Sequence, residues 1–375
     1  MARRTFVFQL YQSKRLRHLH SKIDLAAQMY NHVIAVQKRY YRRFHVYIGR
    51  YSMQRQMTKL KRWRRFAHWK NLDAQTVQNI IWRIDQGYQK FFRKENRRPP
   101  TFRKRVRYHS ITLSQTGWRY DGANRLWLFG RLYRFHHSRD LEGIIKTVTI
   151  KRLPTGRMVI SFSCLCEDEP IVRIKTGQTA GFDFGLTQFL TGHNGHDVAA
   201  PQPLKQSLRA LRKANRTLAR TKPGSAHRRQ AQYRLAHLHA NIVHQRQDWH
   251  WKLAHDLCHR YDTIYLEDLE LRGMVALWGR KMTDLSYGGF LQTLHQVAAR
   301  HANHVHYIDR WFPSTKLCHV CGNLNAFITL RDRVWTCACG AVHHRDRNAA
   351  INIYQEGASS CLQGRCKPTS VAVTT

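Results

Sequence analysis

The sequence predicts an α+β protein of several domains, and three observations lead to this prediction. The chain has 375 residues, 42% of them hydrophobic, which is enough for two or three domains with cores of their own. Strand-like and helix-like patterns occupy separate stretches before they begin to alternate near residue 179. Near the end, four cysteines at metal-ligand spacing precede an acidic residue, Asp346.

The charge predicts a polyanionic partner. The chain carries 64 Lys and Arg but only 23 Asp and Glu, a formal net charge of +41, and a folded protein needs a partner to offset such repulsion. A membrane surface is the alternative to nucleic acid. No run of about 20 apolar residues could span a bilayer, however, and the basic stretches contain aromatic residues, so we expect nucleic acid and no membrane.

The N-terminal residues and the cysteines together predict a reducing compartment. The opening MARRTFVFQLYQSKR lacks the apolar segment of a signal peptide, so we expect a cytoplasmic protein. Nine cysteines in that compartment are expected to be metal ligands and reduced thiols.

The first half of the chain predicts a strand, then helices, then a small sheet or β-barrel. Residues 3–11 alternate like a half-buried strand, and a helical pattern begins near Ile23. Residues 97–108 contain two prolines and a basic cluster, which indicates a boundary. We expect strands at 110–114, 124–130, 144–153 and 158–166.

Two features of the helical stretch bear on function. No acidic residue occurs between Asp24 and Asp73, where many Lys and Arg accumulate, so phosphates are expected to relieve the repulsion. Four aromatic residues follow at helical spacing, and they could stack on bases or form the buried side of a helix; we favour the buried side. These residues are Tyr40, Phe44, Tyr47 and Tyr51.

The second half predicts an α/β unit. An apolar strand carries Asp183, and Asn194-Gly195 indicates a hairpin turn. Residues 203–260 are expected to form a helical hairpin, interrupted at 221–225, with no acid between residues 197 and 248; we expect it to bind phosphates. A second apolar strand ends in Glu267, and a helix to about residue 301 and a last strand follow.

Three acids are candidates for catalysis: Asp183, Glu267 and Asp346. Adjacent strands can place Asp183 beside Glu267, with the last helix bringing Asp346 across them. Such carboxylates would repel one another unless Mg²⁺, or Mn²⁺ in its place, were bound, and two ions about 4 Å apart can catalyse phosphodiester hydrolysis. Each acid alone could equally be a helix cap or an ion-pair partner.

The cysteine pairs predict one structural Zn²⁺. The pairs Cys318-x-x-Cys321 and Cys337-x-Cys339 are each followed by glycine, and four thiolates suit a closed tetrahedral site. Because the second pair is one residue shorter than usual, His343 or His344 remains an alternative ligand.

The chain resembles the transposon-encoded TnpB proteins, compact relatives of type V CRISPR effector nucleases. In order, the resembling segments are GFDFGL, YLEDL, FPSTKLCHVCG and WTCACGAVHHRDRNAAINI. Upstream, RTFVFQLYQSK, PPTFRKR, IIKTVTIKR and MVISFSC resemble further segments of the family, so only the tail is uncovered. The sequence departs from the family pattern in its C-x-C pair and in His344, which stands where many relatives have Asp.

The resemblance implies a domain order. It comprises a wedge β-barrel (1–20 and 98–175) with a helical recognition insertion (21–97), a RuvC-like nuclease of RNase H fold (176–312 and 341–356) and a zinc ribbon that binds target nucleic acid (313–340). Its acids correspond to Asp183, Glu267 and Asp346, and its zinc ligands to the four cysteines. We expect residues 357–375, rich in Ser, Thr and Gly, to be a disordered tail.

The resemblance also implies an RNA-guided DNA endonuclease, with one protein bound to one guide RNA from its own element's end. It further implies a prokaryotic protein that is associated with the nucleoid. Guide pairing would select the target DNA, next to a short adjacent motif. The alternatives are a nuclease-inactive RNA-guided repressor of transcription and a guide-independent transposition accessory factor.

Overall fold

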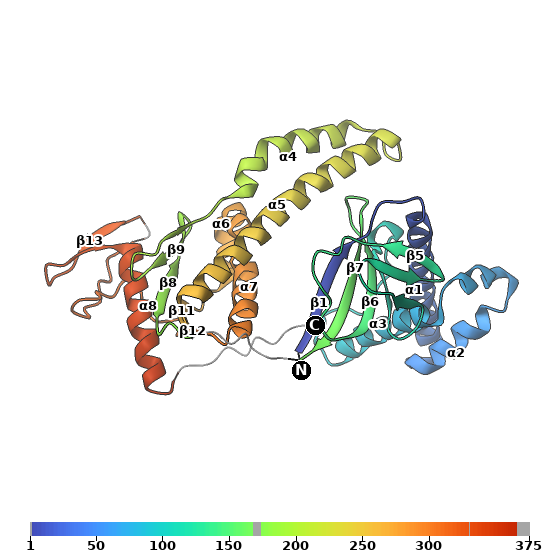
Figure 1. Cartoon of the computed structure of the whole chain (residues 1–375), viewed down its shortest axis with the longest axis horizontal. Helices are drawn as coiled ribbons and strands as arrows, with labels where there is room; N and C mark the ends of the chain where they lie inside the picture. The colour runs from blue at the N-terminus through green and yellow to red at the C-terminus, as the bar shows by residue number, and fades with distance from the viewer. Residues whose placement is uncertain (1, 168–173, 330, 366–375) are drawn as a thin grey trace. The chain divides into compact units, whose positions relative to one another are not determined.

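The structure is a computed structural model that describes residues 2–167, 174–329 and 331–365. The chain divides into two compact units, Met1–Asp168 and Glu169–Thr375 (Figure 1). The sequence placed this division between residues 175 and 176. In the part of the chain that the structure describes, no helix combines the length and apolar character needed to cross a bilayer.

The first unit contains two antiparallel sheets. The larger has the strand order β1-β7-β6-β2, and the smaller has the order β3-β4-β5. Strand β1 pairs with β7 although the two lie at opposite ends of the unit's sequence, so the chain closes on itself. The strands are β1 (Ala2–Gln9), β2 (Ser110–Leu113), β3 (Trp118–Tyr120), β4 (Arg125–Leu128), β5 (Arg131–Arg134), β6 (Ile144–Arg152) and β7 (Met158–Cys166).

The helices of this unit share one hydrophobic core with its sheets. Ile23 of α1 (Leu16–Phe44), Ile80 of α3 (Ala74–Phe92) and Phe162 of β7 belong to the same buried cluster. The other helical segments are α2 (Arg50–Leu60) and two short 3₁₀ helices, Arg64–Asn71 and Arg105–Arg107. The segment predicted as a recognition insertion therefore folds against the sheets.

The prediction that four aromatic residues form one buried helical stripe is wrong. Helix α1 ends at Phe44 because His45 adopts a left-handed conformation with φ of 54°. Tyr40, Phe44 and Tyr51 are 38%, 52% and 68% exposed, and only Tyr47 packs inward, donating a 2.7 Å hydrogen bond to Asp85. The three exposed rings are therefore accessible to a partner.

The second unit is built around a five-stranded mixed sheet of order β10-β9-β8-β11-β12. Strand β11 is parallel to both β8 and β12, whereas β9 is antiparallel to β8 and to β10. The strands are β8 (Thr179–Phe184), β9 (Gln188–Gly192), β10 (Val198–Ala199), β11 (Thr263–Glu267) and β12 (His304–Ile308). The predicted turn at Asn194-Gly195 joins β9 to β10.

The helices of this unit include the predicted helical hairpin, drawn as α4 and α5 in Figure 1. The sequence missed α6, which contains a non-helical residue at Gly279. The helices are α4 (Pro203–Arg220), α5 (Ala226–Arg260), α6 (Leu271–Leu285), α7 (Tyr287–Arg300) and α8 (Arg345–Leu362). A two-stranded ribbon, β13 (Val334–Thr336) and β14 (Val342–His344), precedes α8.

The prediction of a disordered tail from residue 357 is wrong for its first six residues. Helix α8 continues through Leu362, because Ala358 and Cys361 pack against the apolar cluster around Tyr265 and Ile353. Residues 366–375 of the predicted tail lie outside the described residues.

The two faces of the sheet carry different side chains. Phe182 of β8 and Leu266 of β11 belong to the large core formed with α5 and α7. Tyr265 packs instead with Ile353 of α8. Since successive side chains of a strand point to opposite faces, Asp183 and Glu267 point to the α8 face together with Tyr265.

Glycine permits α8 to approach the sheet closely. A Cβ atom on Gly357 would lie 2.4 Å from Cδ1 of Tyr265, and one on Gly181 would lie 2.7 Å from the backbone nitrogen of Tyr354. These two contacts set the separation between α8 and the strands that carry the acids.

We expect Gly357→Ala to destabilise the protein by about 1–3 kcal/mol, because overpacking outweighs the gain of about 1 kcal/mol in helix propensity. Urea denaturation followed by circular dichroism would measure the change. Gly273→Ala is the matched control, since its nearest neighbour would be 3.7 Å away and the same propensity gain should stabilise α6. Equal effects of the two substitutions would contradict the packing argument.

Candidate active site

Two of the three candidate acids lie side by side on neighbouring parallel strands. The register of β8 with β11 places Tyr265 opposite Gly181 and Leu266 opposite Phe182. The next step of this register brings Glu267, the last residue of β11, opposite Asp183. Both side chains lie on the sheet face that α8 covers, so the predicted juxtaposition of the two acids is found.

The third acid comes from α8, which packs against β8, β11 and β12. Asp346 lies in the first turn of this helix, where an acidic side chain favours the positive end of the helix dipole. It lies close enough to Asp183 for its charge to disfavour ionisation of that carboxyl. The three acids therefore converge on one region, although 163 residues separate the first of them from the last in the sequence.

The negative charge of Asp183 is only partly compensated by its surroundings. Burial raises its pKa well above the usual value, and repulsion from Glu267 and Asp346 raises it further. The charge of Arg345 and a hydrogen bond from the backbone of Phe184 oppose this increase without cancelling it. Burial also raises the pKa of Glu267, despite a hydrogen bond of 3.4 Å from the hydroxyl of Ser314.

Asp346 differs from the other two acids because arginines neutralise it. Arg345 donates to its Oδ1 at 3.0 and 3.1 Å, and Arg333 donates to its Oδ2 at 3.1 Å. The Asp346 side chain is 17% exposed, and that of Arg345 is 12% exposed, so this pair is shielded from water. Arg333 lies at the start of the ribbon strand β13, so the ribbon contacts the third acid directly.

These carboxylates could bind a hard divalent cation. Oxygen ligands are those that Mg²⁺ and Mn²⁺ prefer, and a positive ion would relieve the repulsion at Asp183. Among the described residues, two other groups have ligand atoms that all lie within 4.8 Å of one another, and the three acids do not form such a group. The ion pairs of Asp346 hold its oxygens in their present positions.

The four predicted cysteines form a cluster that could hold a metal ion. One ligand atom from each lies within 4.8 Å of the other three. The Sγ atoms of Cys318 and Cys339 are 3.8 Å apart, and those of Cys321 and Cys337 are 3.6 Å apart. The short C-x-C pair therefore contributes both of its sulfurs to the cluster.

The surroundings of Cys318 favour the thiolate form of its side chain. Burial by itself would raise its pKa, but hydrogen bonds from the backbone of Cys321 and Val320 outweigh burial and lower the pKa to about 6. Thiolate is the form that binds zinc, and such backbone amides stabilise it.

The two histidines that the sequence offered as alternative zinc ligands lie outside the group of four sulfur atoms. Nε2 of the buried His343 lies 3.0 Å from Sγ of Cys318, where it can donate to the sulfur of a ligand. His344 is exposed and precedes the first residue of α8. Neither belongs to the cluster of four ligand atoms.

Two asparagines on α8 anchor the cysteine ribbon. The Asn348 side chain donates to the carbonyl of Leu317 at 2.7 Å and accepts from the backbone of His319 at 3.1 Å. One turn later, Asn352 donates to the carbonyl of Ser314 at 2.8 Å. These bonds join the segment next to Cys318 to the helix that carries Asp346.

The sequence did not single out the arginines that bind Asp346, nor Ser314, nor the two asparagines. The segment HHRDRNAAINI contains three of these residues, and the spacing of Asn348 and Asn352 places both on one face of a helix. Nothing in the local sequence indicates the position of Arg333 or Ser314 relative to the acids.

The basic face of α4 borders a groove of about 680 Å³. Its lining carries five cationic side chains and no acid. The lining residues are Arg209, Arg212, Lys213, Arg216, Thr217, Arg220 and Thr221.

Two protein-family models match the chain. The IS605 OrfB family, described as "Probable transposase", matches residues 162–277, and the family described as "Cas12f1-like, TNB domain" matches residues 287–353. The first match covers both strands that carry acids, and the second covers the cysteine ribbon and Asp346.

Known proteins are similar over most of the chain. A "Putative RNA-guided DNA endonuclease" of Streptomyces pristinaespiralis is 32% identical over 322 residues, which are 82% of this chain and 78% of the relative. TnpB-like protein L79 of Acanthamoeba polyphaga mimivirus is 25% identical over 242 residues, 60% of this chain and 46% of that protein.

A solved structure has a similar fold. The protein in the cryo-EM structure of the Cas12f1-sgRNA-target DNA complex aligns with a TM-score of 0.56, covering 94% of this chain and 98% of that chain. The sequence identity is 10%, so this likeness concerns the fold.

Proposed function

This chain belongs to the TnpB family, and from that premise we propose that it is an RNA-guided DNA endonuclease of an IS605-type transposon. It binds a guide RNA from its own element and cleaves matching double-stranded DNA next to a short adjacent motif. The names of its relatives support the guided activity, and its net charge of +41 supports a nucleic-acid partner.

The convergence of three acids carries the proposal of cleavage. Parallel pairing of β8 with β11 puts Asp183 beside Glu267, and Asp346 is close enough to raise the pKa of Asp183 further. A purely structural core would not retain an uncompensated pair of carboxylates, because burying them without partners is costly. A nuclease-inactive repressor would have no use for them.

We assign the three acids as ligands of catalytic Mg²⁺, for which Mn²⁺ is an alternative. When bound, two such ions would activate a water and stabilise the leaving oxygen of the phosphodiester. Asp183 and Glu267 hold their carboxylates on the rigid sheet, and Ser314 orients Glu267 through its hydroxyl. Asp346 contributes a third carboxylate, which Arg345 and Arg333 hold in place by ion pairs.

We assign the domains by position in the fold. The sheets of the first unit form the wedge, with α1 to α3 as the recognition insertion. The five-stranded sheet with α8 is the RuvC-like nuclease, and the segment with the four cysteines is a ribbon that holds one structural Zn²⁺ and binds target DNA.

A comparison with and without guide RNA tests the proposed function. Purified protein would be incubated with a plasmid that carries the target and adjacent motif, using the RNA that co-purifies with it, identified by sequencing. We expect Mg²⁺-dependent linearisation only with matching RNA. Equal cutting without RNA would support a guide-independent factor, and guided binding without cutting would support a repressor.

The basic face of α4 gives a salt-dependent prediction. We expect replacement of Arg209, Arg212 and Arg216 by Gln to weaken RNA binding and to reduce the slope of log affinity against log salt by about 2, since each phosphate contact contributes about 0.7 to 0.9. Filter binding at several salt concentrations measures the slope. The control has Lys at the same positions, which keeps the charge and should keep the slope; an unchanged slope in the Gln variant would place the RNA elsewhere.

A further inference from the structure

A histidine cluster lies in the second unit, apart from the acids and the cysteines. His255 and His259 are one turn apart near the end of α5, and His301 follows Arg300, the last residue of α7. One ring nitrogen from each histidine lies within 4.8 Å of the other two. The cluster lies at the starts of β11 and β12, whereas Glu267 lies at the opposite end of β11.

The geometry brings three imidazoles together from two helices. The ring of His301 lies 5.3 Å from that of His259 and 5.7 Å from that of His255, between centroids. His301 is buried, His255 is half-buried and His259 is exposed, so an ion could enter from the solvent side. Residues four apart share one face of a helix, so α5 offers two ligands at once.

The chemistry of this cluster suits a borderline transition metal. Three imidazoles without a carboxylate favour Zn²⁺, Ni²⁺ or Cu²⁺ over Mg²⁺. Two helices end at the cluster, and helix C-termini favour a positive ion.

Ordinary packing of aromatic rings is the simpler explanation of these contacts. The chain has 24 histidines, so some must meet by chance. Among the described residues, however, only this group of histidines has ring nitrogens that converge within metal-binding reach. Packing requires only that the rings touch, whereas a metal site requires this convergence.

We propose that His255, His259 and His301 bind one transition-metal ion, a second site independent of the cysteine ribbon. The ion would join the last turn of α5 to the end of α7, and thereby hold the starts of the two parallel strands β11 and β12. Three protein ligands leave a further coordination position open to water or another small donor.

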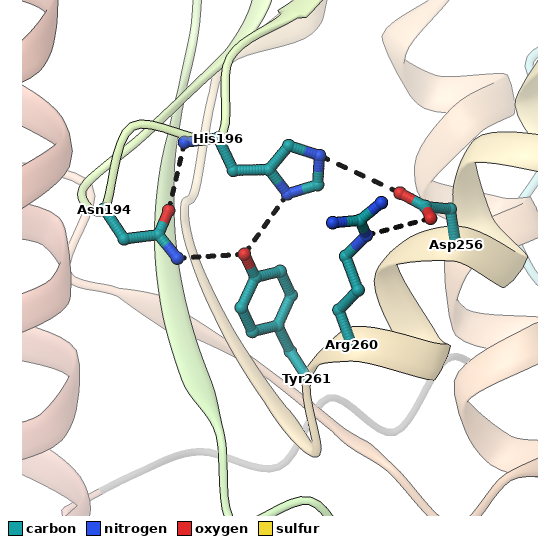
Figure 2. Close-up of polar contacts among 5 residues, drawn as sticks. All are labelled: Asn194, His196, Asp256, Arg260 and Tyr261. Atoms are coloured by element: carbon teal, nitrogen blue, oxygen red, sulfur yellow. Dashed lines mark hydrogen bonds and ion pairs between the residues drawn. The ribbon is translucent and has the colours of Figure 1, made fainter.

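A neighbouring face of the same α5 turn is already fixed. Asp256 pairs with Arg260 at 2.9 Å and with His196 at 3.8 Å, and Tyr261 contacts His196 and Asn194 of the β9–β10 turn (Figure 2). This network binds α5 to one hairpin, and the metal would bind it to α7. The end of the helix would then be held from two directions.

Calorimetric titration with Zn²⁺ tests the site. The protein would be free of any histidine tag, and its ribbon would be loaded with zinc beforehand. We expect one further equivalent to bind to wild type, and this binding to be lost in His259→Gln. His244→Gln, an exposed histidine on α5 outside the cluster, should bind like wild type.

A second measurement excludes a folding artefact. Added Zn²⁺ should raise the melting temperature of wild type and of His244→Gln but not of His259→Gln, with equal circular dichroism spectra for all three. Failure of ribbon-loaded wild type to bind Zn²⁺, or equal binding to both variants, would overturn the proposal. Neither measurement depends on nuclease activity or on guide RNA.

Discussion

Asp183→Asn should lower the rate of DNA cleavage by at least about 10³-fold while leaving guide-RNA affinity unchanged. Asn has nearly the size of Asp but lacks the charge that binds a divalent ion, and loss of metal stabilisation removes several kcal/mol from the transition state. Single-turnover cleavage of labelled target DNA measures the rate, and filter binding measures RNA affinity.

The matched control for this variant is Asp248→Asn. Asp248 lies on the surface of α5, where it pairs with Lys252 at 2.8 Å and its side chain is 63% exposed. We expect this substitution to leave cleavage within about twofold of wild type, because exposed ion pairs contribute little. Retention of cleavage by Asp183→Asn would refute the assignment of Asp183.

The same variant should be more stable than wild type in buffer without added Mg²⁺, with the ribbon zinc left in place. Because the folded-state pKa of Asp183 is raised, ionisation favours the unfolded chain at any pH above the ordinary pKa of about 4. The difference in melting temperature should therefore be present at pH 7 and disappear below about pH 4. A less stable variant at pH 7 would show that Asp183 has a compensating partner.

Cys337→Ser should release zinc and abolish cleavage. Structural zinc contributes on the order of 10–16 kcal/mol to the folding of small zinc domains, far more than the remaining contacts of the ribbon could replace. Loss of the ribbon removes the anchor of Ser314, which bonds Glu267, and of Arg333, which bonds Asp346. Metal analysis and single-turnover cleavage measure the two effects.

The control for the cysteine variant is Ala338→Ser, an exposed neighbour between the two ligands. It introduces the same hydroxyl without removing a sulfur, so zinc content and cleavage should remain. If Cys337→Ser kept both zinc and activity, the cluster would have a ligand other than the four cysteines, and the buried His343 would be the first to examine.

The features that the sequence predicted are those with local signals. The strands of Asp183 and Glu267 are short apolar runs, and the cysteine pairs have their own spacing, so both were found. The helix α6 was missed because its two glycines weaken the helical pattern. The strand β3 was missed because three residues are too few to show alternation, and β5, Arg131–Arg134, was missed because arginines at both of its ends leave only two apolar residues.

The features that the sequence could not predict depend on packing across the chain. The helical spacing of the aromatic residues predicted that Tyr40 and Tyr51 lie on one side of a single helix. The left-handed conformation of His45 ends that helix between them. Arg333 pairs with Asp346 only because the ribbon folds back onto α8. Ion pairs of this kind form between residues that are distant in the sequence. The residues that flank each partner give no sign of the pairing.

The ion pair of Arg333 with Asp346 makes the ribbon a competitor for the third acid. An arginine and a divalent ion cannot both occupy the same carboxylate oxygen, so metal loading at Asp346 requires Arg333 to release it. Arg333→Gln should therefore lower the Mg²⁺ concentration needed for half-maximal cleavage, by up to about fivefold if the pair contributes about 1 kcal/mol. An increased Mg²⁺ requirement would instead assign Arg333 a supporting role.

The turn between α4 and α5 is a position where the chain can accept inserted residues. The acids of β8 and β11 are held by the register of two strands, and the hairpin between them turns at 221–225, at the ends of α4 and α5 remote from those strands. Doubling a flexible loop costs only about 0.6 kcal/mol, so insertions at this turn should be tolerated, whereas one extra residue within either strand would turn its acid to the other face. Evolution could thus have enlarged such a nuclease here, and a fused domain could be inserted at the same place.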